Sequence, residues 1–470
     1  MTGGCTQALR DLDHVRQVVA DTCFPARPTA PVPGRVGLEV ESFPVRVLAD
    51  GTPTGRVPLD FLVALLDQEA RTSPALDSCH EEASAPLYRL AGGGSLNFEP
   101  GGQLEHSTGT HAGAATALGE IDLVAAALAP LLRRNGIVLA AAGADVWLPD
   151  GHVPQQLQAP RYRAMAAYFD RRGPHGAAMM RRTCAIQVNL DLGRPGELAE
   201  RWLVANLVAP LACATFACSP GPGAVSVRAL AWRRLDPTRT GFPRRLVDGS
   251  GTDPVEQLTD AALAADVLLL RRGQGPWEPG EPGWTFHDWL RDGHPRHGRP
   301  GEDDLRYHLT TLFFEVRPRG FLELRSLDAL PAPLRPVPVA LLAGLLEDAR
   351  ARAAALAVLE RHRDGLPQLA WRAGAAGLAD PSLAALAGQV WPLALEGAGR
   401  LPAGYLDGRQ VRLAEDFLER RTLRGRCPAD ELRAALDRGP ADALAWAAEL
   451  ARELDETDKT DATDHCAVRS

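Results

Sequence analysis

The chain has 470 residues, of which 45% are hydrophobic and 23% are charged, a composition typical of soluble globular proteins. Acidic residues outnumber basic ones by 59 to 51, and the formal net charge of −8 favours neither a nucleic-acid partner nor an anionic membrane. Lys459 is the only lysine and lies in a polar tail. This excludes the classes of enzyme that need a P-loop, Schiff-base or kinase-type lysine.

Two further features predict a cytoplasmic protein without a membrane partner. The eight cysteines show no CxxC or zinc-ribbon spacing, which indicates reduced thiols, and the first residues lack the apolar stretch of a signal peptide. Residues 202–218 are uncharged, but they contain Asn206 and Pro210 and are too few to span a membrane comfortably. We therefore expect a buried core helix at 202–218.

Hydrophobic periodicity and turn residues predict the order of the elements. The pattern indicates a helix at 7–21, a strand at 35–47, helices at 58–67 and 113–135, a strand at 137–142, part-helical chain at 155–182, a strand at 184–192 and the helix at 202–218. A mixed helix and loop segment at 243–300 precedes two strands within 308–328, joined at 318–320. Strands with one polar face, alternating with helices, predict an α+β fold in which helices back an antiparallel sheet.

The character of the chain changes near residue 336. Residues 338–361 and 380–455 are rich in Ala, Leu, Arg and Glu and are predicted to be helical. The last residues are polar and are predicted to be disordered. We divide the chain into an N-terminal helix and linker (1–34), a core that carries the chemistry (35–335), a helical C-terminal region (336–454) and a disordered tail (455–470).

Two pairs of glutamates have the spacing of same-face neighbours. Glu39 and Glu41 are two residues apart on the strand predicted at 35–47, so both carboxylates project from one face. Glu99 and Glu105 flank a Pro-Gly-Gly turn that allows the chain to return, and Gln103 shares a face with Glu105 if the chain is extended there. Each pair alone is also typical of a solvated strand face or an exposed hairpin.

Two more strands carry polar groups on alternate residues. Gln187, Asn189 and Asp191 alternate with apolar residues, which predicts one core face and one face suited to a polar ligand. The segments 315–317 and 323–325 each place a glutamate and an arginine on one face, an arrangement also typical of ion pairs on a surface hairpin.

Taken together, these patterns point to a nucleotide site. Clustered glutamates provide the oxygen ligands that hard divalent cations prefer, and the lack of clustered His and Cys argues against zinc. Arginines beside such a cluster suit phosphates, which a guanidinium binds through two parallel hydrogen bonds. The combination favours phosphoryl chemistry assisted by Mg²⁺.

In this order, the residues resemble the plant-type glutamate–cysteine ligase family, which includes bacterial members from glutathione and ergothioneine synthesis. The resemblance covers residues 35–330 and is weakest before residue 35 and at 243–300. Its motifs are Glu39 and Glu41; 96–105; Arg161, Tyr162, Met165 and Tyr168; 179–191; Arg228, Trp232, Asp236 and 239–241; 308–311; 315–317; 322–325; and Asp328.

The resemblance implies a glutamine-synthetase-like catalytic core, in which a curved antiparallel sheet forms a funnel. It implies that ATP drives ligation of the γ-carboxylate of L-glutamate to L-cysteine through γ-glutamyl phosphate, giving γ-glutamylcysteine, ADP and phosphate. This is the first step of low-molecular-weight thiol synthesis. The implied cofactor is Mg²⁺, with Mn²⁺ as a substitute, and the partners are the small-molecule substrates.

Carried over residue by residue, the resemblance also implies roles. Because an acyl phosphate needs no covalent protein nucleophile, Cys184 is expected to be structural. The expected metal ligands are Glu39, Glu41, Glu99, Glu105 and Glu323; the expected substrate-binding residues are Arg161 and Arg228, which hold glutamate, with Gln187, Asn189 and Gln103; and the expected catalytic residues are Glu323 with Arg239 and Arg325, the two phosphate contacts.

Two alternatives stay open. The chain fits an ATP-dependent ligase that joins glutamate to a different amine, because no residue of the acceptor pocket is assigned. It also fits a metal-dependent binding or regulatory protein that has lost catalysis, although such a protein is expected to lack one of the five metal glutamates and all five are present.

Overall fold

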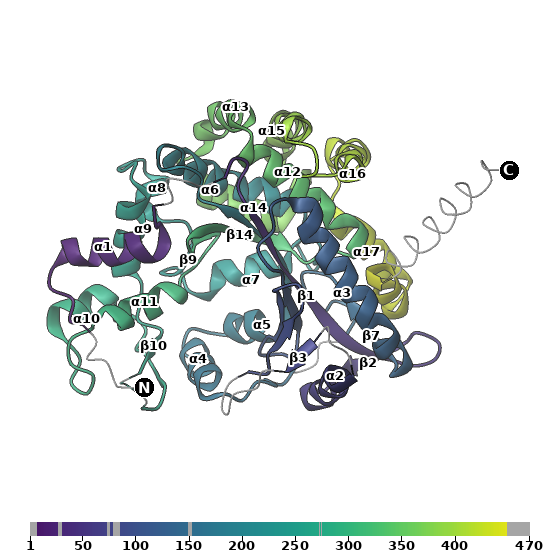
Figure 1. Cartoon of the computed structure of the whole chain (residues 1–470), viewed down its shortest axis with the longest axis horizontal. Coiled ribbons are helices and arrows are strands. Elements are labelled where there is room, and N and C mark those ends of the chain that lie inside the picture. Colours follow the sequence, from purple (N-terminus) through teal and green to yellow (C-terminus); the bar gives the residue numbers. More distant parts are fainter. Residues whose placement is uncertain are drawn as a thin grey trace.

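A ten-stranded sheet lies at the centre of the molecule (Figure 1). The computed structural model describes residues 7–26, 31–72, 76–78, 85–148, 153–271, 273 and 275–448, and every count below refers to these. The main path of the sheet is β13 (Val316–Pro318), β14 (Phe321–Asp328), β8 (Ala185–Asp191), β1 (Val36–Val47), β6 (Leu104–Ser107), β5 (Ser95–Phe98), β4 (Tyr88–Leu90) and β3 (Leu76–Ser78).

The long strand β1 organises this sheet. Its first half pairs with β6 and β8, and its second half pairs with β2 (Pro53–Arg56) and β7 (Ile137–Ala140). All pairings in the sheet are antiparallel. The predicted α+β class is therefore confirmed.

Helices cover the apolar face of the sheet, into which Val36, Leu38 and Val40 of β1 point. The covering helices are α3 (Ala114–Arg134), α6 (Leu198–Thr215) and α12 (Pro336–Glu347). The predicted helix at 202–218 corresponds to α6, which is buried on almost every side. By length and composition, α3 is the one described helix that could cross a membrane, but it packs on β1 and β7 and buries Glu120.

The later helices belong to the same hydrophobic core. Four of the five pack on α6 or α12, and one cluster of buried side chains extends from Leu9 to Ala447. The five are α13 (Ala349–Leu359), α14 (Leu366–Ala376), α15 (Pro381–Arg400), α16 (Gly408–Arg420) and α17 (Pro428–Arg438). The predicted boundary at 335 falls directly before α12, and the predicted tail at 455–470 lies outside the described residues.

Shorter elements cover the polar face of the sheet and enclose the candidate site. They are α4 (Pro160–Asp170), α5 (His175–Arg182), α7 (Val227–Leu235), α11 (Glu302–Thr310) and the strand pairs β9 (Thr240–Gly241) with β12 (Phe313–Phe314) and β10 (Leu269–Leu270) with β11 (Glu278–Pro279). The remaining described helices of four residues or more are α1 (Leu12–Cys23), α2 (Leu59–Thr72), α8 (Arg244–Val247), α9 (Pro254–Ala264) and α10 (Phe286–Asp292).

The structure corrects one predicted element and adds a helix that was not predicted. The strand expected to begin at His308 starts later, because 302–310 form α11, whose first turn is acidic and whose Asp304 caps the backbone of Gly301. The strand predictions for 35–47 and 184–192 are confirmed as β1 and β8. The helix α14 lies in a stretch for which the sequence predicted nothing; its side facing the core is small and apolar.

Candidate active site

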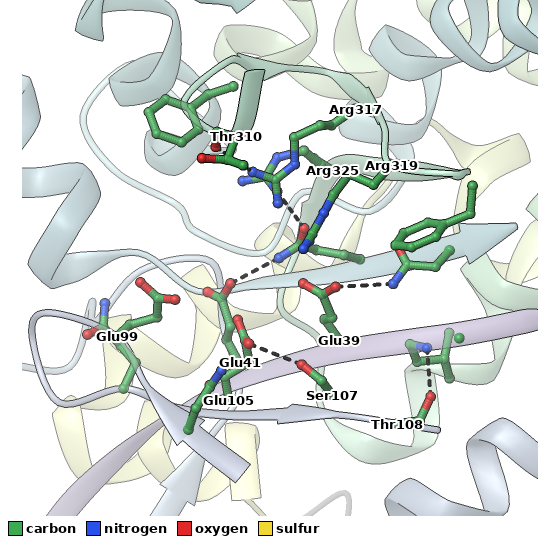
Figure 2. Close-up of a pocket in the computed structure, with 18 of the residues that line it drawn as sticks. Glu39, Glu41, Glu99, Glu105, Ser107, Thr108, Thr310, Arg317, Arg319 and Arg325 are labelled. Atoms are coloured by element: carbon green, nitrogen blue, oxygen red, sulfur yellow. Dashed lines mark hydrogen bonds between the residues drawn. The ribbon is translucent and has the colours of Figure 1, made fainter. Parts of the chain in front are cut away.

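A cavity of about 700 Å³ opens on the polar face of the sheet (Figure 2). Its floor is made by β1, β5, β6, β8 and β14, and its roof by α4, α5, α7 and the chain around 310–321. Of the predicted site residues, the lining includes Glu39, Glu41, Glu99, Gln103, Glu105, Arg161, Gln187, Asn189 and Arg325.

The register of the strands brings the four lining glutamates together. On neighbouring strands Glu41 lies opposite Glu105, and Glu105 lies opposite Asn97. Glu39 lies between Ser107 and Gln187 of the two strands beside it. The turn at 100–102 closes the β5–β6 hairpin and returns Glu99 to this group, as Figure 2 shows.

Burial and mutual repulsion raise the pKa of each of these carboxyl groups. The pKa of Glu39 rises to about 7 because the group is buried and lies near Glu323 and Glu105. The pKa of Glu105 also rises to about 7, through burial and the charge of Glu99. Burial raises the pKa of Glu41 well above its ordinary value and raises that of Glu99 too. The cluster is therefore under electrostatic strain that a cation would relieve.

The carboxylates of Glu39, Glu41, Glu99 and Glu105 form what we call the acidic wall, and few protein donors form hydrogen bonds with them. Glu41 accepts hydrogen bonds from the backbone N–H of Ala185 at 2.9 Å and from Gln187 Nε2 at 3.4 Å. Asn189 Nδ2 donates to Glu39 at 3.2 Å, and Ser107 Oγ donates to Glu105 at 3.1 Å. Among the residues that line the cavity, three have a buried amide oxygen without a hydrogen-bond partner: Asn97, Gln103 and Asn189.

The opposite wall is basic and is organised around Glu323. This carboxylate is fully buried; it accepts from Arg325 Nη1 at 2.9 Å, from Arg317 Nη2 at 2.9 Å and from Arg319 Nη1 at 3.3 Å. Burial alone would raise the pKa of Glu323, but the charges of Arg317 and Arg325 outweigh it and hold the pKa well below its ordinary value. The three guanidinium groups face the glutamates across the cavity in Figure 2.

The donor set of the acidic wall fits Mg²⁺ bound together with a substrate phosphate. Within the described ranges, no three Asp, Glu, His or Cys side chains form a ready-made cation site. Mg²⁺ is usually bound by one or two carboxylates and by substrate phosphates, which agrees with a wall of separate carboxylates and unpartnered amide oxygens. Glu323 does not fit the predicted metal role, because three arginines already occupy its oxygens.

Two predicted arginines lie outside the cavity lining. Arg239 is fully buried, and its guanidinium donates to Asp236 and to the backbone carbonyls of Thr311 and Asp266. Its position corrects the expectation of a phosphate contact, since the side chain is fully buried outside the cavity lining and binds three protein groups there. Arg228 is also buried and contacts Asp328 and the carbonyl of Arg325 rather than the main cavity.

Arg161 and Gln103 do line the cavity. Arg161 is in the first turn of α4, and its Nε donates to the hydroxyl of Tyr307 at 3.0 Å, which fixes the side chain at the cavity edge. Gln103 Nε2 donates to the carbonyl of Thr183 at 3.0 Å, so its unpartnered oxygen faces the site. Cys184 is fully buried, and burial raises the pKa of its thiol far above the ordinary value, as expected for a structural cysteine.

An apolar part of the lining was not predicted. It belongs to one hydrophobic cluster, which gathers side chains from α4, α5, α7 and β12. Its members in the cavity are Tyr162, Met165, Met179, Trp232 and Phe313. These residues are far apart in the sequence, and only the fold brings them together. Arg317 and Arg319 were also missed as site residues, although the 315–317 motif and the turn at 318–320 signal both.

Comparison with known proteins agrees with this geometry. The profile of glutamate–cysteine ligase family 2 matches residues 35–454. The chain belongs to that family. The family resemblance and the prediction of a ligase are therefore confirmed.

Two mycobacterial relatives support the same assignment. The chain is 35% identical over 328 residues to the glutamate–cysteine ligase EgtA of Mycolicibacterium smegmatis, covering 67% of this chain and 70% of the relative. It is 34% identical over 407 residues to EgtA of Mycobacterium tuberculosis, covering 82% and 86%. A crystal structure of a Francisella tularensis glutamate–cysteine ligase in complex with AMP aligns over 91% of this chain and 90% of its own, with 13% identity and a TM-score of 0.44.

Proposed function

We propose that this ligase uses ATP to join the γ-carboxylate of L-glutamate to the amino group of L-cysteine, giving γ-glutamylcysteine, ADP and phosphate. The observation that carries this proposal is the cavity itself, in which four buried glutamates face three arginines. We further propose that the curved sheet forms a glutamine-synthetase-like funnel and that the enzyme works in the cytoplasm, where ATP and reduced cysteine are available.

The chemistry divides between the two walls. A carboxylate is a poor acyl donor, so its γ-oxygen first takes the γ-phosphoryl group of ATP and ADP leaves. The cysteine nitrogen then attacks the resulting acyl phosphate, phosphate leaves, and the attacking amine loses a proton. Mg²⁺ held by Glu39, Glu41, Glu99 and Glu105 would neutralise charge on the phosphates.

The basic wall binds the transferring phosphoryl group. Arg317 and Arg325 present planar guanidinium groups, and Glu323 fixes both by accepting from each. Such preorganised donors lower the energy of the transition state, since they need no reorientation as charge develops. Gln187 accepts from Arg325 Nη1 at 2.8 Å and further limits its movement.

Glutamate is then expected at the Arg161 end of the cavity. Of the arginines that line the cavity, Arg35 and Arg161 do not contact Glu323, and Arg161 lies beside the apolar wall, so its charge is available for a substrate carboxylate there. The apolar wall beside it is the surface suited to the cysteine thiol, because methionine and aromatic groups pack well against a soft sulfur atom. The product would enter the synthesis of a thiol such as glutathione or ergothioneine.

The decisive experiment follows the oxygen atoms of glutamate. With γ-¹⁸O-labelled glutamate, cysteine, ATP and Mg²⁺, we expect γ-glutamylcysteine by mass spectrometry and one ¹⁸O in the released phosphate. Unlabelled phosphate would contradict the acyl phosphate. Ligation of another amine in preference to cysteine would identify a different acceptor, and no glutamate-dependent ADP formation with any amine would favour a binding protein.

A matched pair of variants ties the reaction to the cavity. Glu41→Gln removes a carboxylate from the acidic wall, whereas Glu120→Gln removes an equally buried carboxylate that contacts His106 and His111 on the core side of the sheet. We expect Glu41→Gln to abolish ligation and Glu120→Gln to retain it in the folded fraction.

A further inference from the structure

A β-bulge in β14 sets the direction of Arg325. Leu324 lies opposite Val188 and Leu327 lies opposite Ile186, so Arg325 and Ser326 together face the single residue Gln187. A bulge turns a side chain away from the regular alternation and leaves backbone groups outside the ladder. Here it aims the guanidinium of Arg325 at Gln187 and Glu323, on the cavity side.

Arg228 of α7, which is not part of the sheet, binds the backbone of this bulge. Its Nη2 donates to the carbonyl oxygen of Arg325 at 2.8 Å, and its Nη1 lies 3.6 Å from Asp328 Oδ1. The guanidinium borders a small hollow of about 20 Å³ that shares Trp232, Phe313 and Arg325 with the lining of the main cavity. A space of that volume holds about one water molecule.

Asp328 in turn is rigidly held. Its Oδ2 accepts from Ser219 Oγ at 2.6 Å and from the backbone N–H of Cys218 at 2.8 Å, and its Oδ1 accepts from Ser226 Oγ at 2.9 Å. The backbone of Gly143 packs closely against this carboxyl group, because a Cβ on Gly143 would lie 2.3 Å from the carboxyl carbon of Asp328. Asp328 is therefore a fixed anchor for the guanidinium of Arg228.

We propose that Arg228 and Asp328 are positioning residues that act through Arg325. On the proposed ligase function, on which this inference rests, Asp328 orients Arg228, Arg228 holds the bulge carbonyl, and the bulge holds Arg325 against the phosphoryl group. This assigns Arg228 a role different from the glutamate contact that the family resemblance implies. It also gives a role to a buried arginine that is not part of the lining of the main cavity.

The first test compares two buried arginines that each bind one backbone carbonyl and one carboxylate. Arg228→Lys keeps the charge but cannot reach both the carbonyl and the carboxylate. The matched control is Arg352→Lys on α13, because Arg352 is equally buried and also binds a backbone carbonyl, that of Leu346, and a carboxylate, that of Glu200. We expect Arg228→Lys to lower kcat about 10- to 100-fold with KM for glutamate and ATP changed less than about 3-fold, and Arg352→Lys to leave kcat within about 2-fold.

A double-mutant cycle separates positioning from direct contact. If Arg228 acts through Arg325, then Arg228→Lys should cause little further loss in an enzyme that already carries Arg325→Lys. Multiplicative losses in kcat/KM, or a selective rise in KM for glutamate, would overturn the proposal and make Arg228 a substrate contact. Asp328→Asn serves as a second variant with the same expected direction if Arg228→Lys does not fold.

A readout without substrates keeps the inference independent of the reaction. The backbone N–H of Arg325 donates to the carbonyl of Glu315, so its hydrogen exchange reports the bulge directly. We expect at least about 10-fold faster exchange at 325–327 in Arg228→Lys and Asp328→Asn, with β6 unchanged. Unchanged exchange at 325–327 would overturn the inference. Faster exchange in a protein that makes no γ-glutamylcysteine would uphold the positioning and refute the proposed function alone.

Discussion

At the scale of single residues, the ionised carboxylates of the acidic wall destabilise the folded protein, and a bound cation would offset this effect. The carboxyl groups of Glu39 and Glu105 each have a pKa raised to about 7, chiefly by burial and then by neighbouring carboxylates. In the folded protein these groups hold protons that the unfolded chain releases. Their contribution to stability is complete below about pH 4.5 and is lost as the pH rises through 7.

The first prediction concerns Glu39→Gln in the metal-free protein. The amide cannot ionise, so the variant should be more stable than the parent by about 1–3 kcal/mol at pH 8 and nearly equal to it at pH 4.5. Calorimetry in EDTA at several pH values measures this difference. Turnover should nevertheless be abolished, because a ligand for Mg²⁺ is gone. A variant that is less stable than the parent at pH 8 would contradict the raised pKa.

The second prediction separates Glu99 from Glu323. Glu99→Gln should raise the Mg²⁺ concentration needed for half-maximal activity at least about 10-fold, because it weakens the acidic wall. Glu323→Gln should leave that concentration unchanged, lower kcat and reduce stability by about 3–5 kcal/mol, since Arg317 and Arg325, which are mostly buried, lose the carboxylate that they share with the exposed Arg319. Mg²⁺ titration of both variants measures the contrast. If Glu323→Gln also raised the Mg²⁺ concentration needed for half-maximal activity, Glu323 would be a metal ligand despite its contacts with the three arginines.

The period of a strand alone predicted that Glu39 and Glu41, and likewise Gln187 and Asn189, share one face. Their place in the cavity, and that of Glu99, was implied by the family resemblance. Arg228 and Arg239 could not be placed in this way. Both follow the family motif, but long side chains reach whatever carbonyl or carboxylate packing provides, and here these are Arg325 and Asp236.

At the scale of elements, the β5–β6 hairpin positions five cavity residues at once: Asn97, Glu99, Gln103, Glu105 and Ser107. Its turn needs glycine for a steric reason, because a Cβ on Gly101 would lie 2.3 Å from the carbonyl oxygen of Arg181 in α5. Close approach of this turn to α5 keeps Gln103 bonded to Thr183. The hairpin was predicted from its Pro-Gly-Gly turn, but its contact with α5 was not, since nothing local signals it.

The third prediction follows from that contact. Gly101→Ala should move the turn away from α5, destabilise the protein by about 1–3 kcal/mol and lower kcat/KM at least about 10-fold, since Glu99 and Gln103 shift together. The control is Gly119→Ala on α3, where a Cβ meets nothing within 4 Å and helix propensity should raise stability by up to about 1 kcal/mol. Thermal unfolding and steady-state kinetics measure both. Normal kinetics in Gly101→Ala would contradict the role of the turn.

The bulge in β14 could not be predicted from the sequence, although the strand itself was. The strand was recognised from the alternation at 321–328, but alternation assumes a regular ladder, and the extra residue at 325–326 breaks it. Similarly, 308–311 were included in the segment predicted to be extended up to residue 328, while the acidic residues at 302–304 favoured the helix that forms. In both places a tertiary contact or a helix start outweighed the local pattern.

At the scale of the whole molecule, the C-terminal helices are part of the structure that supports the site. In α12 almost every residue is buried, and the helix packs on α3, α6 and β8, directly behind the strand that carries Gln187 and Asn189. Sequence character alone separated residues 336–454 from the core, because they contain no recognisable motif. The single cluster of buried side chains joins them to it.

The last prediction is that a chain ending at residue 335 does not fold. Removing α12 would expose the apolar faces of α6 and β8, and each fully buried leucine or valine left in water costs about 1.5–3 kcal/mol. Because whole domains are stable by only about 5–15 kcal/mol, losing the contacts of Leu341, Leu342 and Leu345 with their neighbours suffices to unfold the rest. Expression, gel filtration and circular dichroism of residues 1–335 beside residues 1–448 measure the outcome. A soluble shorter chain with a cooperative unfolding transition would contradict the shared core and make 35–335 an independent domain.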